Sequence, residues 1–216
     1  MYIHTYIGDY LMTASTITIP RLPRVAIVVA AIWLALALLA GATGFLAQLP
    51  FPGPQLIIFG LFATTLVAVT SVPALRAWVD ALPLRVLVGL NGVRFIGITF
   101  LVLAAKGQLA PDFAARAGWG DIAAAVLALV LVAAGEPRTG LHRGLTHAWN
   151  AFGLIDLVVA VATATAVTLR GATPGMAPLL SLPLVVVPTF FVPILLTNHV
   201  VIFRRLLAAG RAVHAR

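Results

Sequence analysis

The chain has 216 residues, of which 62% are hydrophobic and only 9% are charged. This number of polar side chains is too small to cover the surface of a soluble globular protein of this length. The composition therefore excludes a soluble globular protein and predicts a membrane protein. A formal net charge of +8 would suggest nucleic acid in a soluble domain. Here the basic residues flank apolar segments, so we expect them to face lipid headgroups and expect no nucleic-acid partner.

The N-terminal region precedes the first apolar segment. Residues 1–20 are polar and aromatic without a clear period, so we expect a flexible or interfacial segment, and either Met1 or Met12 could be the start. The segment that follows Arg21 and Arg24 imitates a signal peptide. Its apolar run is nevertheless about 23 residues long, against roughly 7–15 in a signal peptide. We therefore expect an uncleaved first span.

Six apolar stretches are each long enough, at about 1.5 Å per residue, to cross most or all of a hydrocarbon core of ~30 Å. The gaps between them are too short for a soluble domain. The sequence therefore predicts an all-α, polytopic six-helix transmembrane bundle over residues 21–210, followed by a basic tail over residues 211–216. The predicted spans are 25–47, 54–72, 84–105, 119–134, 148–169 and 183–203.

The basic residues fall mostly into alternate loops. Ten of the 14 Lys and Arg residues lie before the first span, in or at the edge of the second and fourth gaps or after the last span, whereas three lie in the other gaps. The remaining one, Arg94, lies inside the third span. By the positive-inside rule, this asymmetry places both termini in the cytoplasm.

Polar residues inside the predicted spans are informative because a charge in the bilayer core is costly unless it is paired or hydrated. Arg94 is too deep in the third span to reach the interface, so it should meet an anion. Asp156 in the fifth span has a similar depth and is the predicted partner. With Asn91, Asn150 and His199, these residues should form one buried polar site in the cytoplasmic half of the bundle, open to the cytoplasm.

The last predicted span contains prolines that interrupt its hydrogen bonds. Pro188 frees the carbonyl of Leu184, and Pro193 frees that of Thr189. In a membrane these carbonyls need other partners. The resulting bend suits a substrate cavity or a hinge; alternatively, Thr189 and neighbouring helices satisfy the carbonyls and the bend only shapes the packing. Thr189 and Asn198 are therefore secondary candidates for the site.

A catalytic alternative rests on Gly118-Trp119-Gly120-Asp121. This segment is similar to the short Gly-x-Gly-Asp motif of presenilin-like and prepilin-peptidase-like aspartyl proteases. Asp156 could supply the second carboxylate of a dyad that shares one proton. The predicted spans place Asp121 near the outer end of its helix and Asp156 nearer the inner side. We therefore expect the two carboxylates to lie apart, with Asp121 only a secondary candidate.

The chain offers few ligands for a cofactor. It has no cysteine, which excludes disulfides and thiolate metal sites. His147 and His199 could hold a b-type haem, but two isolated histidines are weak support for one. We expect no metal site and no cofactor.

Five motifs together resemble a widespread group of bacterial membrane proteins of about this length that has no assigned activity. The resemblance covers residues 85–200 and implies a six-helix architecture, a shared polar site and a bacterial inner membrane, but no reaction. The motifs are Arg94-Phe95-x-Gly97-x-x-Phe100-Leu101, Gly107-x-Leu109-x-Pro111-x-Phe113-Ala114, Ala117-Gly118-x-Gly120-Asp121, Trp149-Asn150-x-x-Gly153-x-x-Asp156-Leu157 and Pro188-Thr189-x-x-Val192-Pro193-x-x-x-x-x-His199.

Three functional hypotheses follow. The first is a small-solute or ion transporter, or a channel-like protein, with the Arg94–Asp156 pair in its site. The second is a non-catalytic assembly or interaction subunit of a membrane complex, in which the pair only fixes helix packing and a membrane protein or a second copy is the partner. The third is an intramembrane enzyme or a haem protein. A cavity that reaches the charged pair would favour the first.

Overall fold

The computed structural model describes residues 21–137 and 139–214. The predicted N-terminal segment, Arg138 and the end of the basic tail lie outside the described residues. Within the described part every regular element is helical, and 6 helices are long and apolar enough to cross a membrane. The predicted helical class and the predicted number of spans are therefore confirmed at this level.

Two of the six long helices change type along their length. The third combines an α-helix, a 3-10 helix and a second α-helix, and the sixth begins with a π-helix. The elements are α2 (Arg24–Ala42), α3 (Phe45–Gln48), α4 (Gly53–Ser71), α5 (Pro73–Ala81), α6 (Leu84–Gly89), η1 (Leu90–Ile96), α7 (Gly97–Ala105), α8 (Pro111–Ala133), α9 (Gly140–Leu169), η2 (Ala177–Leu180), η3 (Val187–Phe191) and α10 (Val192–His214).

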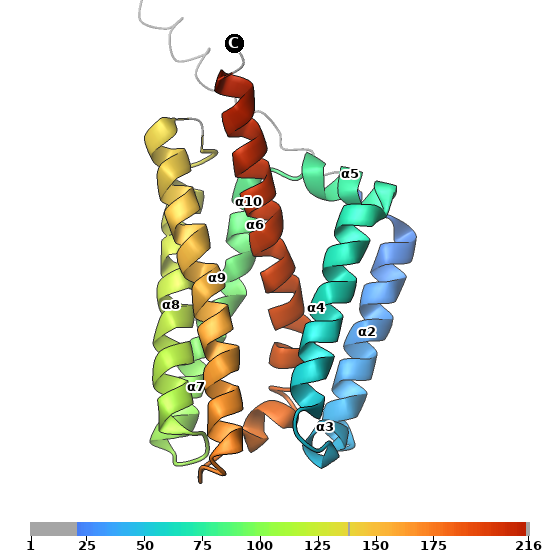
Figure 1. The fold of residues 1–216 in the computed structure, drawn as a ribbon, viewed down its shortest axis with the longest axis vertical. Coiled ribbons are helices and arrows are strands. Elements are labelled where there is room, and N and C mark those ends of the chain that lie inside the picture. Colours follow the sequence, from blue (N-terminus) through green and yellow to red (C-terminus); the bar gives the residue numbers. More distant parts are fainter. Residues whose placement is uncertain (1–20, 138, 215–216) are drawn as a thin grey trace, which may run out of the picture.

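The helices form a tight group and a peripheral pair. Helix α8 packs between α9 and the α6–η1–α7 helix, and α10 packs against both α9 and α4. Helices α2 and α4 stand on the other side of α10 (Figure 1). Helix α4 buries no residue, and α2 buries only Ala37 and Gly41. The core that positions polar groups is therefore the group of α6–η1–α7, α8, α9 and α10.

The two ends of the bundle are distinct. One end, here the C-terminal end, carries α5, the start of α9 and the end of α10 (Figure 1, top). The opposite end, here the α3 end, carries α3, the α7–α8 loop and η2. The start of α2 lies at the C-terminal end, so the chain enters and leaves the bundle on the side that the charge pattern assigns to the cytoplasm.

Two helices begin earlier than their apolar runs. Helix α8 starts at Pro111 rather than Trp119, with proline in the first turn and Asp112 near the positive end of the helix dipole. Helix α9 starts at Gly140, where the N-cap Thr139 accepts a hydrogen bond from the His142 amide at 3.2 Å. The early start of α8 moves Asp121 from the expected helix end to mid-helix.

Candidate charged site

Arg94 joins three helices in the middle of the bundle. Its side chain is only 1% exposed. Its Nε donates to Asp121 Oδ1 on α8 at 2.7 Å, and its Nη1 donates to the Gly153 carbonyl on α9 at 3.0 Å. Its Nη2 donates to Asp156 Oδ2, also on α9. We call Arg94, Asp121 and Asp156 the charged cluster.

The expected partner Asp156 is present, but the expected separation of Asp121 from Asp156 is wrong. Because α8 begins at Pro111, Asp121 lies at mid-helix and reaches the same guanidinium as Asp156. The two carboxylates are held by Arg94 rather than by a shared proton, which is not the arrangement of a protease dyad. With all three groups ionised, the charged cluster carries one net negative charge.

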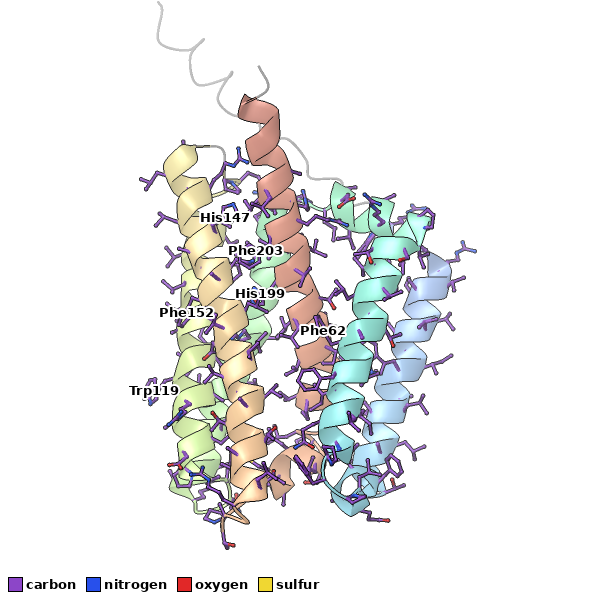
Figure 2. The ribbon with its side chains drawn as sticks, in the orientation of Figure 1. Phe62, Trp119, His147, Phe152, His199 and Phe203 are labelled. Atoms are coloured by element: carbon purple, nitrogen blue, oxygen red, sulfur yellow. The ribbon has the colours of Figure 1, made fainter. Side chains whose placement is uncertain are left out.

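Glycines make room for the charged cluster. At Gly120 the Asp156 carboxylate occupies the place of a side chain. A Cβ at Gly97 would lie 2.5 Å from the Gly118 carbonyl oxygen and 2.9 Å from Asp121 Cβ. In the Gly-x-Gly-Asp motif, Gly118 thus allows a close crossing of α7 and α8, Gly120 leaves room for the Asp156 carboxylate, and Asp121 is itself the second carboxylate. The side chain of Trp119 points away from the bundle (Figure 2).

His199 lies beside the charged cluster and is fully buried. Its Nδ1 is 2.8 Å from Asn150 Oδ1, and Asn150 Nδ2 donates to the His199 carbonyl at 2.9 Å. Because Asn150 Oδ1 can only accept, Nδ1 carries the proton and Nε2 is an acceptor. Nε2 faces Gly153, where a Cβ would lie 3.0 Å from Nε2 and 3.1 Å from Arg94 Nη1.

Two asparagines extend the polar region toward α6. Asn198 Nδ2 donates to the Leu87 carbonyl at 2.8 Å, and Asn91 Nδ2 lies 3.4 Å from the same oxygen and 3.3 Å from the Val88 carbonyl. Both side chains are buried, and neither Oδ1 has a partner. Of the predicted residues, His199 lies next to Arg94 at Gly153 and Asn150 bonds to His199, whereas the side chain of Asn91 bonds to carbonyls of α6.

The carbonyls freed by the prolines have partners. Trp33 Nε1 on α2 donates to the Thr189 carbonyl, which Pro193 frees, at 2.8 Å. The Val187 amide lies 2.9 Å from the Leu184 carbonyl, which Pro188 frees. The Thr189 hydroxyl donates to the Val185 carbonyl at 2.6 Å. This agrees with the alternative in which the freed carbonyls are satisfied, one by a neighbouring helix and one within the segment itself, but no feature of the sequence marked Trp33 as the donor.

Cavities reach the charged cluster from the α3 end. One cavity of about 220 Å³ runs from the α3–α4 region to Asp121, and another of about 290 Å³ borders Arg94, Asp121 and η3. The expected opening lay at the other end, near His199. Pro188 lines the first of these cavities, and Val93, Arg94 and Ile96 of η1 line the second.

His147, the second residue of the haem alternative, packs elsewhere. Its ring lies 6.0 Å from that of Phe203. Figure 2 shows it nearer the C-terminal end than His199. His199 is enclosed by Asn150, Gly153 and Trp149, whose ring centroid is 5.6 Å away.

Residues 52–207 match a protein family described as a domain of unknown function, DUF8737. The chain belongs to this family. The matched region begins at the start of α4 and contains every residue of the charged cluster, whereas α2 and α3 precede it. No curated protein and no solved structure matches the chain. The family match gives no reaction, so the function must be inferred from the site.

Proposed function

We propose that this member of the DUF8737 family is an inner-membrane transporter for a small solute or ion. Its binding site is the charged cluster, and both of its termini are cytoplasmic. The observation that carries the proposal is the composition of the cluster. One buried arginine binds two carboxylates, and the three side chains come from the middle of three different helices. Ionisable residues at membrane depth are expensive and are kept mainly where a solute, ion or proton must pass.

The net charge supports a functional site over a purely structural pair. A single carboxylate would neutralise Arg94, and the second adds an uncompensated negative charge in an apolar environment. That excess charge favours a proton or a cationic ligand in the loaded state. A cluster that only held helices together would gain nothing from it.

The helix geometry points the same way. Arg94 lies in the 3-10 segment η1, and the π-helical segment η3 borders the cavity that reaches Arg94 and Asp121. Interrupted helices at mid-membrane are typical of transporter binding sites, and π-helical turns occur frequently at functional sites. Both non-α segments line the cavity that reaches Arg94 and Asp121.

One observation favours the second candidate, a subunit of a membrane complex. Helix α4 buries no residue of its own, so an apolar face is open to lipid or to a partner helix. In that case the charged cluster should be permanently dry, which separates the two functions experimentally.

Cysteine accessibility tests transport without knowledge of the substrate. The chain has no native cysteine. Ala117 lines the cavity of about 220 Å³ one turn from Asp121, and Thr146 is buried between the site and the C-terminal end. We expect Ala117→Cys to react with an impermeant thiol reagent from the α3 side of sealed vesicles and Thr146→Cys from the other side. Ala125→Cys, at a fully buried position of α8, is the control that should stay unreactive.

A substrate site that is reached alternately from both sides requires both reactions. If Ala117→Cys reacts and Thr146→Cys does not, the cavity is a dead end and transport is excluded. If neither position reacts while the variants keep the thermal stability of the parent, the cluster is a dry structural core and the subunit function is the better one.

A further inference from the structure

The buried polar side-chain atoms that lack a hydrogen-bond partner are all of one kind. Among the described residues, every buried side-chain atom without a partner is an acceptor. The four atoms are Gln55 Oε1, Asn91 Oδ1, Asn198 Oδ1 and His199 Nε2. Buried acceptors without donors are destabilising, so a core with several of them is completed by a ligand or water that donates.

The cavity that runs from the α3–α4 region to Asp121 repeats this pattern. Its polar lining includes Gln55, Asp121, Thr165 and Thr168, and the remainder is mostly aliphatic and aromatic. The two threonine hydroxyls donate to carbonyls of their own helix, Val161 and Ala164, both at 2.9 Å. Each hydroxyl therefore offers only its lone pairs to a ligand. The side-chain oxygens of these residues are thus able to accept hydrogen bonds, and Asp121 can also carry a negative charge.

The size and walls of the cavity favour an organic ligand over water. Its volume of about 220 Å³ exceeds the roughly 30 Å³ that one water molecule occupies in the liquid. Phe51, Phe100 and Phe113 border it, and such surfaces favour an apolar body. The ligand that fits combines an apolar body with positively charged hydrogen-bond donors.

We propose, on the basis of the proposed function, that the charged cluster binds an amphipathic organic cation. The apolar body of this ligand fills the cavity between α4 and α9, and its ammonium group contacts Asp121. The ligand enters from the α3 end, where Gln55 provides a second acceptor. Its charge neutralises the excess negative charge of the cluster, while Arg94 stays bound to both carboxylates.

Equilibrium dialysis with radiolabelled n-hexylammonium tests this inference. The protein is placed in nanodiscs of neutral phosphatidylcholine, and empty nanodiscs correct for partition into lipid. We expect saturable binding of n-hexylammonium, about tenfold weaker binding of 1-hexanol and no binding of hexanoate. Asp121→Asn should weaken cation binding about tenfold or more. Asp112→Asn, an exposed acid of the same helix, should leave it unchanged.

A second variant keeps the test valid if Asp121→Asn does not fold. Ala164→Phe fills the cavity and leaves every charged group in place, so it should abolish binding. Equal binding of 1-hexanol and n-hexylammonium, or wild-type cation binding by either variant, would overturn the inference. The cysteine experiment and the binding experiment can fail independently. If Thr146→Cys is unreactive but the cation binds, transport is excluded and the ligand class stands. If both cysteines react but no cation binds, the ligand class is excluded and transport stands.

Discussion

At the scale of single residues, an arginine shared by two carboxylates differs energetically from a simple ion pair. Arg94 loses its hydration on burial and recovers stabilisation from three hydrogen bonds to Asp121, Asp156 and the Gly153 carbonyl. Removing the arginine leaves two charges without a partner, whereas removing one aspartate leaves a neutral pair. The stability of the bundle should therefore depend unequally on the three side chains.

Arg94→Leu should lower the free energy of unfolding by about 3–5 kcal/mol, the usual effect of breaking a buried ion pair. Asp156→Asn should cost less, because Asp121 still pairs with Arg94. In an Asp121→Asn/Asp156→Asn background, the cost of Arg94→Leu should fall sharply because no charge remains unpaired. Equilibrium unfolding in mixed detergent micelles measures each value.

The exposed pair of Asp112 with Arg170, at 3.4 Å, is the control for this cycle. Asp112→Asn should change the free energy of unfolding by less than about 1 kcal/mol, as surface pairs usually do. If the losses at Arg94 and at the two buried aspartates simply add, the three groups do not act as one cluster.

Gly120→Ala should destabilise the protein by about 1–3 kcal/mol, because the new methyl group overlaps the Asp156 carboxylate. Gly144→Ala on α9 is the matched control. A Cβ there meets nothing within 4 Å, so alanine should stabilise the helix by up to about 1 kcal/mol. Thermal unfolding in detergent gives both shifts. A stabilising Gly120→Ala would show that Asp156 does not rest against α8.

At the scale of elements, what the sequence could predict depended on how each helix begins. The apolar run that carries Arg94 matches its helix, and Asp156 stays near the middle of α9 although that helix begins before its apolar run, so their pairing could be predicted. Asp121 could not be placed, because Asp112 and Arg116 interrupt the hydropathy of α8 although the helix includes both. Helix ends near the membrane interface tolerate such charges, and only the proline and acidic start signals marked the true beginning.

The bend in the last span could also be predicted only in part. The freed Thr189 carbonyl was predictable from Pro193, but its donor was not, since hydropathy does not show toward which helix Trp33 turns. Trp33→Phe should cost about 1 kcal/mol of unfolding free energy by removing this donor. Pro193→Ala restores an amide that can bond to Thr189 within the helix, so Trp33→Phe should then cost much less.

Unfolding measurements on the two single variants and the double variant provide this cycle. The Trp33 ring also packs on Phe190, with centroids 4.9 Å apart, and this contact is lost in both backgrounds. Only the difference between the two costs reports the hydrogen bond. Equal costs in the two backgrounds would mean that the Trp33 bond does not offset the missing amide.

At the scale of the whole molecule, the charge pattern and the helix arrangement agree on which chain segments share a side. Arg76 and Asp80 on α5 lie with Arg204 at the C-terminal end, where Asp80 pairs with both arginines. The α7–α8 loop and η2 lie at the α3 end, which holds few basic residues. This agreement comes from the alternation of six long helices, which the sequence could predict, and does not depend on the site.

The predicted orientation places α3 outside and α5 in the cytoplasm. In the cysteine-free parent, Gln48→Cys on α3 and Ala77→Cys on α5 introduce exposed thiols at opposite ends of the bundle. In right-side-out vesicles an impermeant maleimide should label Gln48→Cys, and Ala77→Cys should become reactive only after the membrane is permeabilised. The reverse result would invert the orientation, so that the cavity beside Asp121 would face the cytoplasm. Labelling of both thiols from one side would mean an even number of spans between them, and this would rule out α4 as the single span that separates α3 from α5.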